Sequence, residues 1–346
     1  MNRESLRRLV VDFADQRPIF TLPAWVADRL RAALPPDWTL HIVSTPADGT
    51  GDGAAAASAE VIEAVRSAEA YFGYGVPAEI LRQGAGLRWV HSGTAGVRSS
   101  LTPEMLERDV VFTNSAGVHA PAMAETVLAM ILHFARGLDH AVRAQAAGRW
   151  DKRGFDAVDA PVREVAGSTV GIVGYGGIGR EVAKRARAFG ARVIALKRRP
   201  ARPERDVEIV YGRDGLERIL EESDYIVLSA PETPETQGLI DAAALARLRP
   251  HAVLVNVARG GLVDEDALVD ALRGGRLRGA ALDVFATEPL PETSPLWRLP
   301  NVLITPHVSA YTHRFWEREC ALLEANLARY LAGQPLLNVV DKRAGY

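Results

Sequence analysis

The chain has 346 residues, of which 41 are lysine or arginine and 43 are aspartate or glutamate. Because these charges nearly cancel, no strong electrostatic field draws the protein to nucleic acid or to an acidic membrane surface. A single cysteine, Cys320, excludes an internal disulfide framework and fits a reducing compartment. The length is sufficient for two domains.

The N-terminus lacks the layout of a signal peptide, because its apolar run at 9–11 is short and is soon broken by Asp12. The longest apolar segment, around 126–134, is too short to cross a bilayer. Cys320 has no paired metal ligands nearby, so we expect an inert or surface thiol and no metal site. These features predict a soluble, cytoplasmic protein without membrane or nucleic-acid partners.

The first 115 residues alternate short apolar runs with helical patterns, an order typical of an α/β unit with a parallel sheet. The expected strands are 9–13, 39–43, 70–74, 87–91 and 110–114, and the expected helices are 23–33, 58–67, 77–83 and 103–108. Residues 48–57 are rich in glycine and alanine and are predicted to form a surface loop. The stretch 91–97, HSGTAGV, could turn several backbone N–H groups toward an anion, although an ordinary turn is the simpler interpretation.

Residues 120–136 form a predicted helix that is apolar nearly all round. Such a helix is buried on more than one side, so it either crosses between domains or lies in a subunit interface. Residues 148–167 then lead, largely as loop, to the most informative stretch of the chain.

That stretch, 168–199, reads as strand 169–173, a glycine turn, a helix from about 180 to 189 and a second strand at 192–196. The glycines are Gly174, Gly176 and Gly179, in the GxGxxG spacing of dinucleotide-binding turns. Phosphate oxygens would lie on the free N–H groups at the start of the helix. The complete strand–turn–helix–strand frame favours this interpretation over an ordinary tight turn.

Further strands are predicted at 224–229, 252–257, 279–284 and 302–305, with helices at 265–272 and 314–331. The last three of these strands are each followed by an unusual polar residue, namely Arg259, Glu288 and His307. Ligands of an open parallel sheet bind outside the carboxyl ends of its strands. We therefore expect these three residues to converge on the crevice where the glycine turn would hold a dinucleotide.

Their chemistry suits hydride transfer. An arginine can hold a carboxylate bidentately, and a histidine can exchange the hydroxyl proton while the hydride moves. A neighbouring carboxylate fixes the ring and favours its protonated form. Taken one at a time, each residue also has an ordinary structural explanation. Arg259 could cap a helix, Glu288 could be a solvated turn residue, and His307 could be a histidine whose hydrogen bonds are made within the fold.

Five motifs between residues 170 and 310 carry a resemblance that covers nearly the whole chain: VGIVGYGGIGREVA (170–183), PETPETQGLI (231–240), VLVNVARGGLVDEDALVDAL (253–272), GAALDVFATEPL (279–290) and NVLITPHVSA (301–310). With them the sequence resembles the D-isomer-specific 2-hydroxyacid dehydrogenases. The run SPLWRLPNVLITPH (294–307) is most similar to the glyoxylate/hydroxypyruvate reductase branch.

The resemblance implies an α/β fold of two Rossmann/flavodoxin-like domains with parallel sheets and an active site in the cleft between them. The substrate domain would comprise 1–115 and 316–346, and the dinucleotide-binding domain 116–315. His307 would be the acid/base, Glu288 its partner, and Arg259 would bind substrate together with backbone N–H groups of Thr94, Ala95 and Gly96. The helix at 120–136 would form a homodimer interface.

The cofactor would be bound by a larger set of residues, with Asp283 holding the nicotinamide carboxamide. The set comprises Gly174, Gly176, Gly177, Ile178, Gly179, Lys197, Arg198, Arg199, Pro231, Thr236, Val257, Ala258 and Asp283. An acidic residue that reads the ribose is usual at the end of the second strand, but Lys197, Arg198 and Arg199 stand there. The sequence therefore predicts a preference for NADP(H), with NAD(H) as a further possibility.

The predicted activity is reduction of a small 2-keto acid to the D-2-hydroxy acid by a nicotinamide-dependent oxidoreductase. A nicotinamide-sensing, corepressor-like protein of the same fold is the alternative, since sensors can retain the Arg/Glu/His set. A methyltransferase on a similar glycine turn is disfavoured, because it would not need those three residues.

Overall fold

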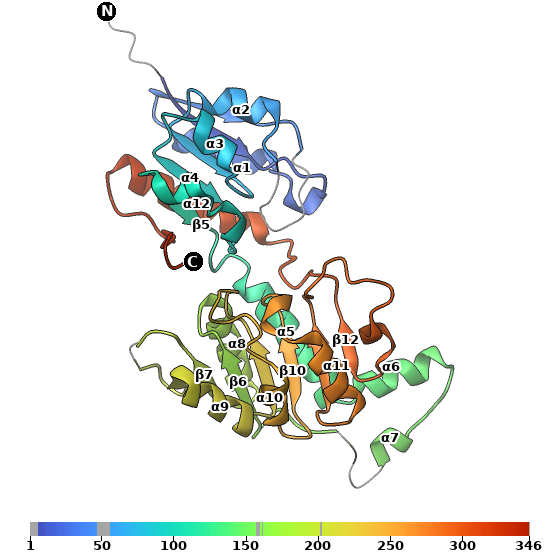
Figure 1. The fold of residues 1–346 in the computed structure, drawn as a ribbon. Coiled ribbons are helices and arrows are strands. Elements are labelled where there is room, and N and C mark those ends of the chain that lie inside the picture. Colours follow the sequence, from blue (N-terminus) through green and yellow to red (C-terminus); the bar gives the residue numbers. More distant parts are fainter. Residues whose placement is uncertain (1–5, 47–55, 157–159, 161, 201–202, 346) are drawn as a thin grey trace, which may run out of the picture. The chain divides into compact units, whose positions relative to one another are not determined.

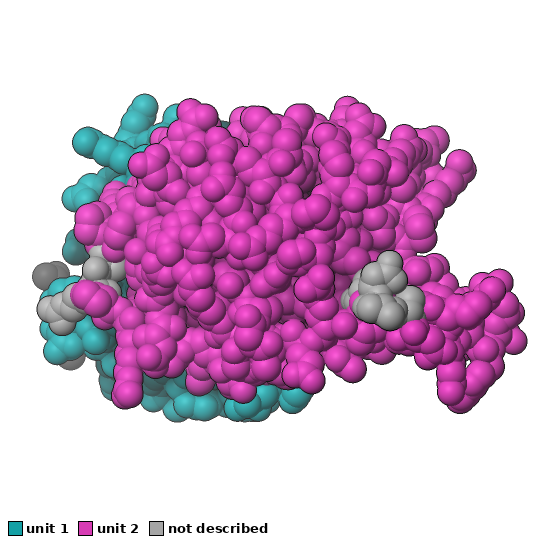
Figure 2. Space-filling view, turned by 90° about the horizontal axis from the view of Figure 1, so that it is seen from below, with its two compact units in different colours: residues 1–119, 312–346 teal, residues 120–311 magenta. Residues whose placement is uncertain are grey.

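The computed structural model describes residues 6–46, 56–156, 160, 162–200 and 203–345. It divides into two compact units, residues 1–119 with 312–346 and residues 120–311, which Figure 2 distinguishes by colour. Each unit has its own parallel sheet and its own core. Residues 48–55 of the predicted surface loop lie outside the described residues. The assignment of substrate and nucleotide binding to the two domains stays a prediction.

The first unit contains a five-stranded parallel sheet in the order β2-β1-β3-β4-β5 (Figure 1), the flavodoxin-like order. Its strands are β1 (Arg7–Asp12), β2 (Trp38–Ile42), β3 (Ala70–Gly73), β4 (Trp89–Ser92) and β5 (Val111–Asn114). Successive side chains point to opposite faces. Val10 therefore joins the core on one face of the sheet, whereas Leu9 and Val11 join the core on the other.

Helices cover both faces of this sheet. They are α1 (Ala24–Ala33), α2 (Ala59–Val65), α3 (Ala78–Gln83), α4 (Pro103–Glu107) and α12 (Phe315–Leu331). Helices α2, α3 and α4 pack on one face, and α1 and α12 pack on the other. The hydroxyls of Ser58 and Thr102 cap α2 and α4 by accepting from N–H groups in the first turn, which explains where these helices begin.

The second unit contains a seven-stranded parallel sheet in the order β12-β11-β10-β9-β6-β7-β8. Its strands are β6 (Thr169–Val173), β7 (Arg192–Leu196), β8 (Glu208–Val210), β9 (Tyr225–Leu228), β10 (Val253–Asn256), β11 (Gly279–Leu282) and β12 (Val302–Ile304). The strand order reverses between β6 and β9, which is the switch point where a doubly wound sheet opens a crevice. The predicted class of two α/β domains with parallel sheets is confirmed.

The helices of the second unit are α5 (Ala120–Ala135), α6 (Leu138–Ala146), α7 (Arg153–Asp156), α8 (Gly177–Ala188), α9 (Gly212–Glu222), α10 (Ala242–Ala246) and α11 (Glu265–Arg273). Helices α5 and α8 pack on one face of the sheet, and α9, α10 and α11 pack on the other. The sequence reading missed α6, α9, α10 and the short edge strand β8. The single turn of α7 interrupts the predicted loop at 148–167.

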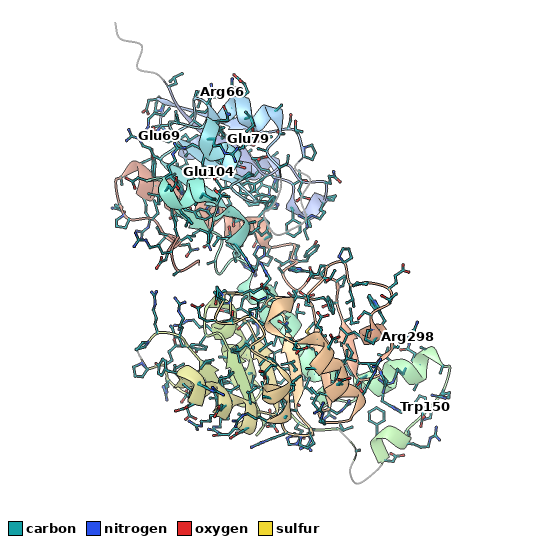
Figure 3. The ribbon with its side chains drawn as sticks, viewed as in Figure 1. Arg66, Glu69, Glu79, Glu104, Trp150 and Arg298 are labelled. Carbon is teal, nitrogen blue, oxygen red and sulfur yellow. The ribbon has the colours of Figure 1, made fainter. Side chains whose placement is uncertain are left out.

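Helix α5 is buried on more than one side, as predicted, since it packs against α8 and against the sheet. The segment after α5 leaves apolar side chains exposed. Leu138 and Val142 of α6 are exposed, and Trp150 (Figure 3) is 92% exposed. A subunit interface through 120–136 stays a prediction. None of the described helices is long and apolar enough to cross a membrane.

Candidate active site

The glycine turn between β6 and α8 has the close backbone contacts that its sequence predicts. Gly174 has φ +101°, and a Cβ there would lie 2.4 Å from the Ala230 nitrogen. A Cβ on Gly179 would lie 2.4 Å from the Gly174 carbonyl oxygen, which also accepts a hydrogen bond of 2.8 Å from Ser229 Oγ. Neither glycine tolerates a side chain without backbone movement.

Gly176 precedes the first turn of α8 and gives it no side-chain cap. A Cβ on Gly176 would meet no heavy atom within 4 Å, so the space in front of the turn is open. Helix α8 begins at Gly177, earlier than the predicted residue 180, which places Gly177 and Ile178 in its first turn. Uncapped N–H groups facing open space fit a pyrophosphate.

Other predicted cofactor residues line the same edge of the seven-stranded sheet. Thr236 Oγ1 donates to the Pro231 carbonyl oxygen at 2.7 Å and accepts from the Thr233 N–H at 2.8 Å, which closes the loop after β9. Val257 and Ala258 directly follow β10 and are buried.

The basic run lies at the end of β7, one strand beyond β6. The Lys197 N–H donates to the Val210 carbonyl oxygen at 3.0 Å, whereas the side chains of Arg198 and Arg199 are exposed. Hydrogen bonding from Thr233 and the positive charge of Arg198 both lower the pKa of Glu235. Arg198 therefore acts electrostatically on the loop after β9, across the switch point from its own strand.

The structure brings Glu288 and His307 into direct contact, and their strands β11 and β12 are neighbours in the sheet. His307 Nδ1 lies 2.7 Å from Glu288 Oε2, and the Phe285 N–H donates to Glu288 Oε1 at 2.9 Å. Both side chains are about one-third exposed, at 33% and 32%. Burial alone would raise the pKa of Glu288, but these two hydrogen bonds and the nearby charges of His307 and Arg259 lower it.

Asp283, at the end of β11, holds the loop that carries His307. Its backbone oxygen accepts from the His307 N–H at 2.9 Å. Its carboxylate accepts from Thr305 Oγ1 at 2.6 Å, from the Val308 N–H at 2.9 Å and from the Ser309 N–H at 3.0 Å. These bonds hold His307 at φ +53°, a conformation uncommon for residues other than glycine. A contact of Asp283 with nicotinamide stays a prediction.

Arg259 follows β10 in a loop that a neighbouring amide holds in place. Asn256 Nδ2 donates to the Arg259 carbonyl oxygen at 2.9 Å, and Asn256 Oδ1 accepts from the Ala258 N–H at 3.0 Å. Gly260 approaches the backbone of Phe285 so closely that a Cβ would lie 1.9 Å from the Phe285 carbonyl carbon. Sequence reasoning missed Asn256, although one asparagine in the apolar run VLVNV could have drawn attention to it.

Thr94, Ala95 and Gly96 lie in the first unit, directly after β4, whereas the Arg259, Glu288 and His307 set belongs to the second. Thr94 Oγ1 donates to the Gly96 carbonyl oxygen at 2.8 Å. The N–H groups of Ala95 and Gly96 have no hydrogen-bond partner among the described residues. A turn of this kind can receive an anion through its backbone.

Two further features concern metal binding and the position of a cavity. In the part of the chain that the structure describes, no group of three or more His, Cys, Asp or Glu side chains could hold a metal ion. A cavity of about 370 Å³ is lined by Phe134, Tyr225 and Arg278, among others. It lies where strands β9 to β11 begin, so it is at the opposite edge of the sheet from the glycine turn.

Comparisons with known proteins agree with this arrangement. The profile of the D-isomer specific 2-hydroxyacid dehydrogenase NAD binding domain matches residues 128–309. A glyoxylate reductase of Korarchaeum cryptofilum is 35% identical over 270 residues, which are 77% of this chain and 80% of that protein. A D-3-phosphoglycerate dehydrogenase of Mycobacterium tuberculosis is 37% identical over 270 residues, or 78% of this chain. The match spans only 50% of that protein, about half its length.

Among solved structures, a D-isomer specific 2-hydroxyacid dehydrogenase from Xanthobacter autotrophicus Py2, in complex with NADPH and MES, superposes with a TM-score of 0.79. It is 32% identical, and the superposition covers 99% of this chain and 100% of that one. The sequence motifs, the two parallel sheets and the paired Glu288 and His307 lead to the same conclusion as these matches. The chain belongs to the family of D-isomer-specific 2-hydroxyacid dehydrogenases.

Proposed function

We propose that the protein is an NAD(P)H-dependent oxidoreductase that reduces a small 2-keto acid, of the glyoxylate or hydroxypyruvate kind, to the D-2-hydroxy acid. The observation that carries this proposal is the 2.7 Å contact between His307 Nδ1 and Glu288 Oε2, close to the charge of Arg259. These side chains follow three neighbouring strands of the sheet that also carries the glycine turn.

The proposed roles follow from the donors and acceptors present. A bound reduced nicotinamide supplies the hydride. His307 contacts Glu288 through Nδ1, and its Nε2 would donate a proton to the substrate carbonyl oxygen. The keto acid gains one hydride and one proton, and the neutral imidazole regains its proton from solvent. The planar guanidinium of Arg259 would hold the substrate carboxylate bidentately.

The N–H groups of Ala95 and Gly96, which no described residue accepts, would be a second set of donors for that carboxylate. The active site would then use residues of both predicted domains. We also propose a homodimer through the region of 120–136. The exposed apolar side chains of Leu138, Val142 and Trp150, which directly follow that helix, support this interface.

For the cofactor we propose a preference for NADPH over NADH. The glycine turn and the uncapped start of α8 would hold the pyrophosphate. Lys197, Arg198 and Arg199 would hold the 2′-phosphate, because two guanidinium groups and an ammonium suit a dianion. The NADPH bound to the Xanthobacter relative is consistent with this choice.

An NADPH- and NADH-oxidation screen tests the proposal, with glyoxylate, hydroxypyruvate, pyruvate, bulkier 2-keto acids and 3-phosphohydroxypyruvate as substrates. The phosphorylated acid is included because of the phosphoglycerate dehydrogenase relatives. We expect turnover of short 2-keto acids. Equal activity on aldehydes or ketones that lack a carboxylate would contradict the proposed roles of Arg259 and the 94–96 turn. Tight NADPH binding without turnover of any acid would favour the corepressor-like alternative.

A further inference from the structure

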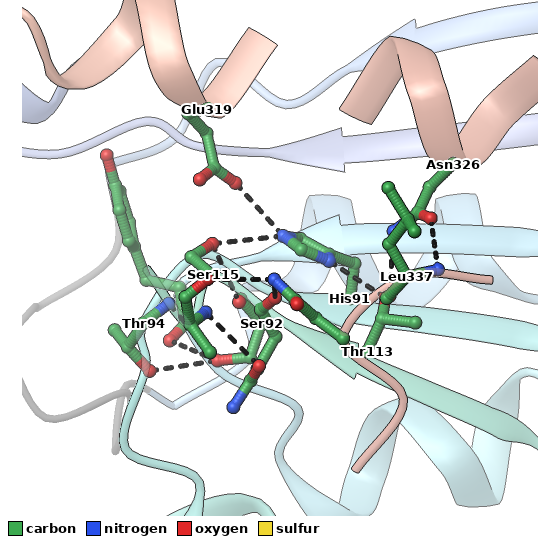
Figure 4. Close-up of polar contacts among 12 residues, drawn as sticks. His91, Ser92, Thr94, Thr113, Ser115, Glu319, Asn326 and Leu337 are labelled. Carbon is green, nitrogen blue, oxygen red and sulfur yellow. Dashed lines mark hydrogen bonds and ion pairs between the residues drawn. The ribbon is translucent and has the colours of Figure 1, made fainter. Parts of the chain in front are cut away.

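Helix α12 carries two fully buried polar side chains, Glu319 and Asn326, which lie two turns apart on one face of the helix (Figure 4). Glu319 Oε2 is buried and has no hydrogen-bond partner among the described residues. A buried carboxylate with one unsatisfied oxygen stabilises a fold less than an apolar side chain of similar volume would. A role in positioning another part of the molecule explains Glu319 better than a role in stability.

Glu319 contacts His91, the residue just before the 92–96 loop. His91 Nε2 lies 2.9 Å from Glu319 Oε1, and His91 Nδ1 lies 2.8 Å from Thr113 Oγ1. Thr113 Oγ1 also accepts from Trp89 Nε1 at 2.9 Å and lies 3.5 Å from the Val90 carbonyl oxygen, to which its hydroxyl can donate. When the Thr113 hydroxyl donates to Val90, Nδ1 is the protonated donor to Thr113. One proton is then left between Nε2 and Oε1, whichever group holds it.

The contact between His91 and Glu319 determines which acceptor the Ser115 hydroxyl donates to. Ser115 Oγ lies 3.1 Å from His91 Nε2 and 3.2 Å from the Ser92 carbonyl oxygen. Because Glu319 already satisfies Nε2, the hydroxyl hydrogen of Ser115 is available to Ser92. The Ser115 N–H also contacts the carbonyl oxygens of Ser92 at 3.0 Å and Thr94 at 3.3 Å. Removal of Glu319 would let the Ser115 hydroxyl turn to Nε2 and lose its hydrogen bond to the Ser92 carbonyl oxygen, which the Ser115 N–H alone would then contact.

Asn326 reaches the same loop by a second route. Its side-chain oxygen accepts from the Leu337 N–H at 2.7 Å, and its amide donates to the Leu337 carbonyl oxygen at 3.1 Å. The next residue, Asn338, exchanges hydrogen bonds with the backbone of Asn114. Asn114 Nδ2 in turn donates to the Ala95 carbonyl oxygen at 2.9 Å.

Both routes hold carbonyl oxygens of the loop on Ser115 and Asn114, and the N–H groups of Ala95 and Gly96 have no hydrogen-bond partner among the residues that the structure describes. We propose that Glu319 and Asn326 are positioning residues for the substrate-carboxylate loop, so that the remote helix α12 sets the affinity for the keto acid. This inference rests on the proposed function, in which the N–H groups of 94–96 bind that carboxylate.

Steady-state kinetics of two variants test the proposal. Glu319→Leu should raise the KM of the keto acid about tenfold, the effect of one lost hydrogen bond, with kcat and the Kd of NADPH unchanged. Glu319→Gln should keep a near-normal KM, because its amide can donate to His91 Nε2 and restores the same arrangement. Equal KM values for Glu319→Leu and the wild type would overturn the proposal.

Ser115→Ala gives an independent test if Glu319→Leu does not fold, because it removes the hydroxyl hydrogen bond to the Ser92 carbonyl oxygen and leaves α12 and the Ser115 N–H contact intact. It should raise KM in the same way, and an unchanged KM would count against the proposal. Tyr330→Phe is the matched control. Tyr330 is also on α12, but its hydroxyl donates to Glu69 Oε1 at 2.7 Å, where β3 begins, at the other edge of the sheet. A KM increase in Tyr330→Phe equal to that of Glu319→Leu would show general destabilisation instead.

Amide hydrogen exchange of the peptide 91–97 separates this inference from the proposed function, because it needs no activity. Exchange should be faster in Glu319→Leu and Ser115→Ala than in the wild type, and unchanged in Tyr330→Phe. If the wild type reduces no keto acid, the proposed function fails, and faster exchange would still show that α12 positions the loop. Unchanged exchange in both variants would refute the positioning role.

Discussion

The clearest quantitative prediction concerns Asp12, the last residue of β1. Asp12 is only 8% exposed, and Tyr71 donates to its Oδ2 at 2.8 Å. Burial raises the pKa of Asp12 to about 6; the negative charge of Glu60 adds to this, and the Tyr71 hydrogen bond opposes it. The folded protein therefore binds a proton at Asp12 at a pH where the unfolded chain has already lost it.

The size and sign of the effect follow from linkage. A rise in pKa from about 3.9 in the unfolded chain to about 6 corresponds to about 3 kcal/mol. Because the pKa is raised in the folded state, Asp12 lowers the free energy of unfolding as the pH rises from about 4 to about 6. Asp12→Asn carries no charge and can still accept from Tyr71. We expect this variant to match the wild type near pH 4 and to be more stable by up to about 3 kcal/mol at pH 7.

Urea denaturation at several pH values, followed by tryptophan fluorescence, measures this difference. The buried tryptophans Trp38, Trp89 and Trp316 all lie in the first unit, so the signal reports mainly on the unfolding of that unit. Asp15→Asn is the matched control. Burial would raise the pKa of Asp15, but its hydrogen bonds and ion pair with Arg17 lower it, so this carboxylate stabilises the fold at neutral pH.

Asp15→Asn should therefore destabilise the protein at pH 7. This loss of unfolding free energy should shrink as the pH falls through the pKa of Asp15 in the folded protein. The reasoning about Asp12 would be refuted if Asp12→Asn changed stability equally at pH 4 and pH 7. It would also be refuted if the variant were less stable than the wild type at pH 7.

Three further predictions concern the proposed reaction. His307→Ala should reduce kcat by a factor of about 10² to 10⁴ and leave the Kd of NADPH nearly unchanged; near-normal turnover in this variant would remove His307 from the mechanism. Glu288→Gln should shift the pH profile of reduction toward acid. Arg259→Lys retains the charge but loses the planar fork, so kcat/KM for the keto acid should fall strongly, and an unchanged value would exclude bidentate binding. The kcat/KM ratio of NADPH to NADH should exceed one and should fall in the double variant Arg198→Ala with Lys197→Asp; a wild type that favours NADH would exclude a phosphate-binding role for the basic run.

The sequence alone determined the features that depend on neighbouring residues or on strand order. The glycine turn was predictable because Gly174 and Gly179 lie between an apolar strand and an amphipathic helix. The meeting of Glu288 with His307 was predictable because the carboxyl ends of parallel strands share one edge of a sheet. Helix α9 and the edge strand β8 were missed: α9 begins with two glycines in four residues, and β8 is short and only half-buried.

Only the tertiary structure decided how the loops that carry these residues are held. Asp283 holds the His307 loop, and Asn256 holds the Arg259 loop, through hydrogen bonds that no hydrophobic periodicity encodes. His91 and Glu319 are 228 residues apart in the chain, and their contact exists because α12 packs on the sheet that β4 helps to form. Local sequence patterns specify strands, helices and turns. Buried polar pairs depend instead on which distant segments fold against each other, and that is decided by the packing of the whole unit.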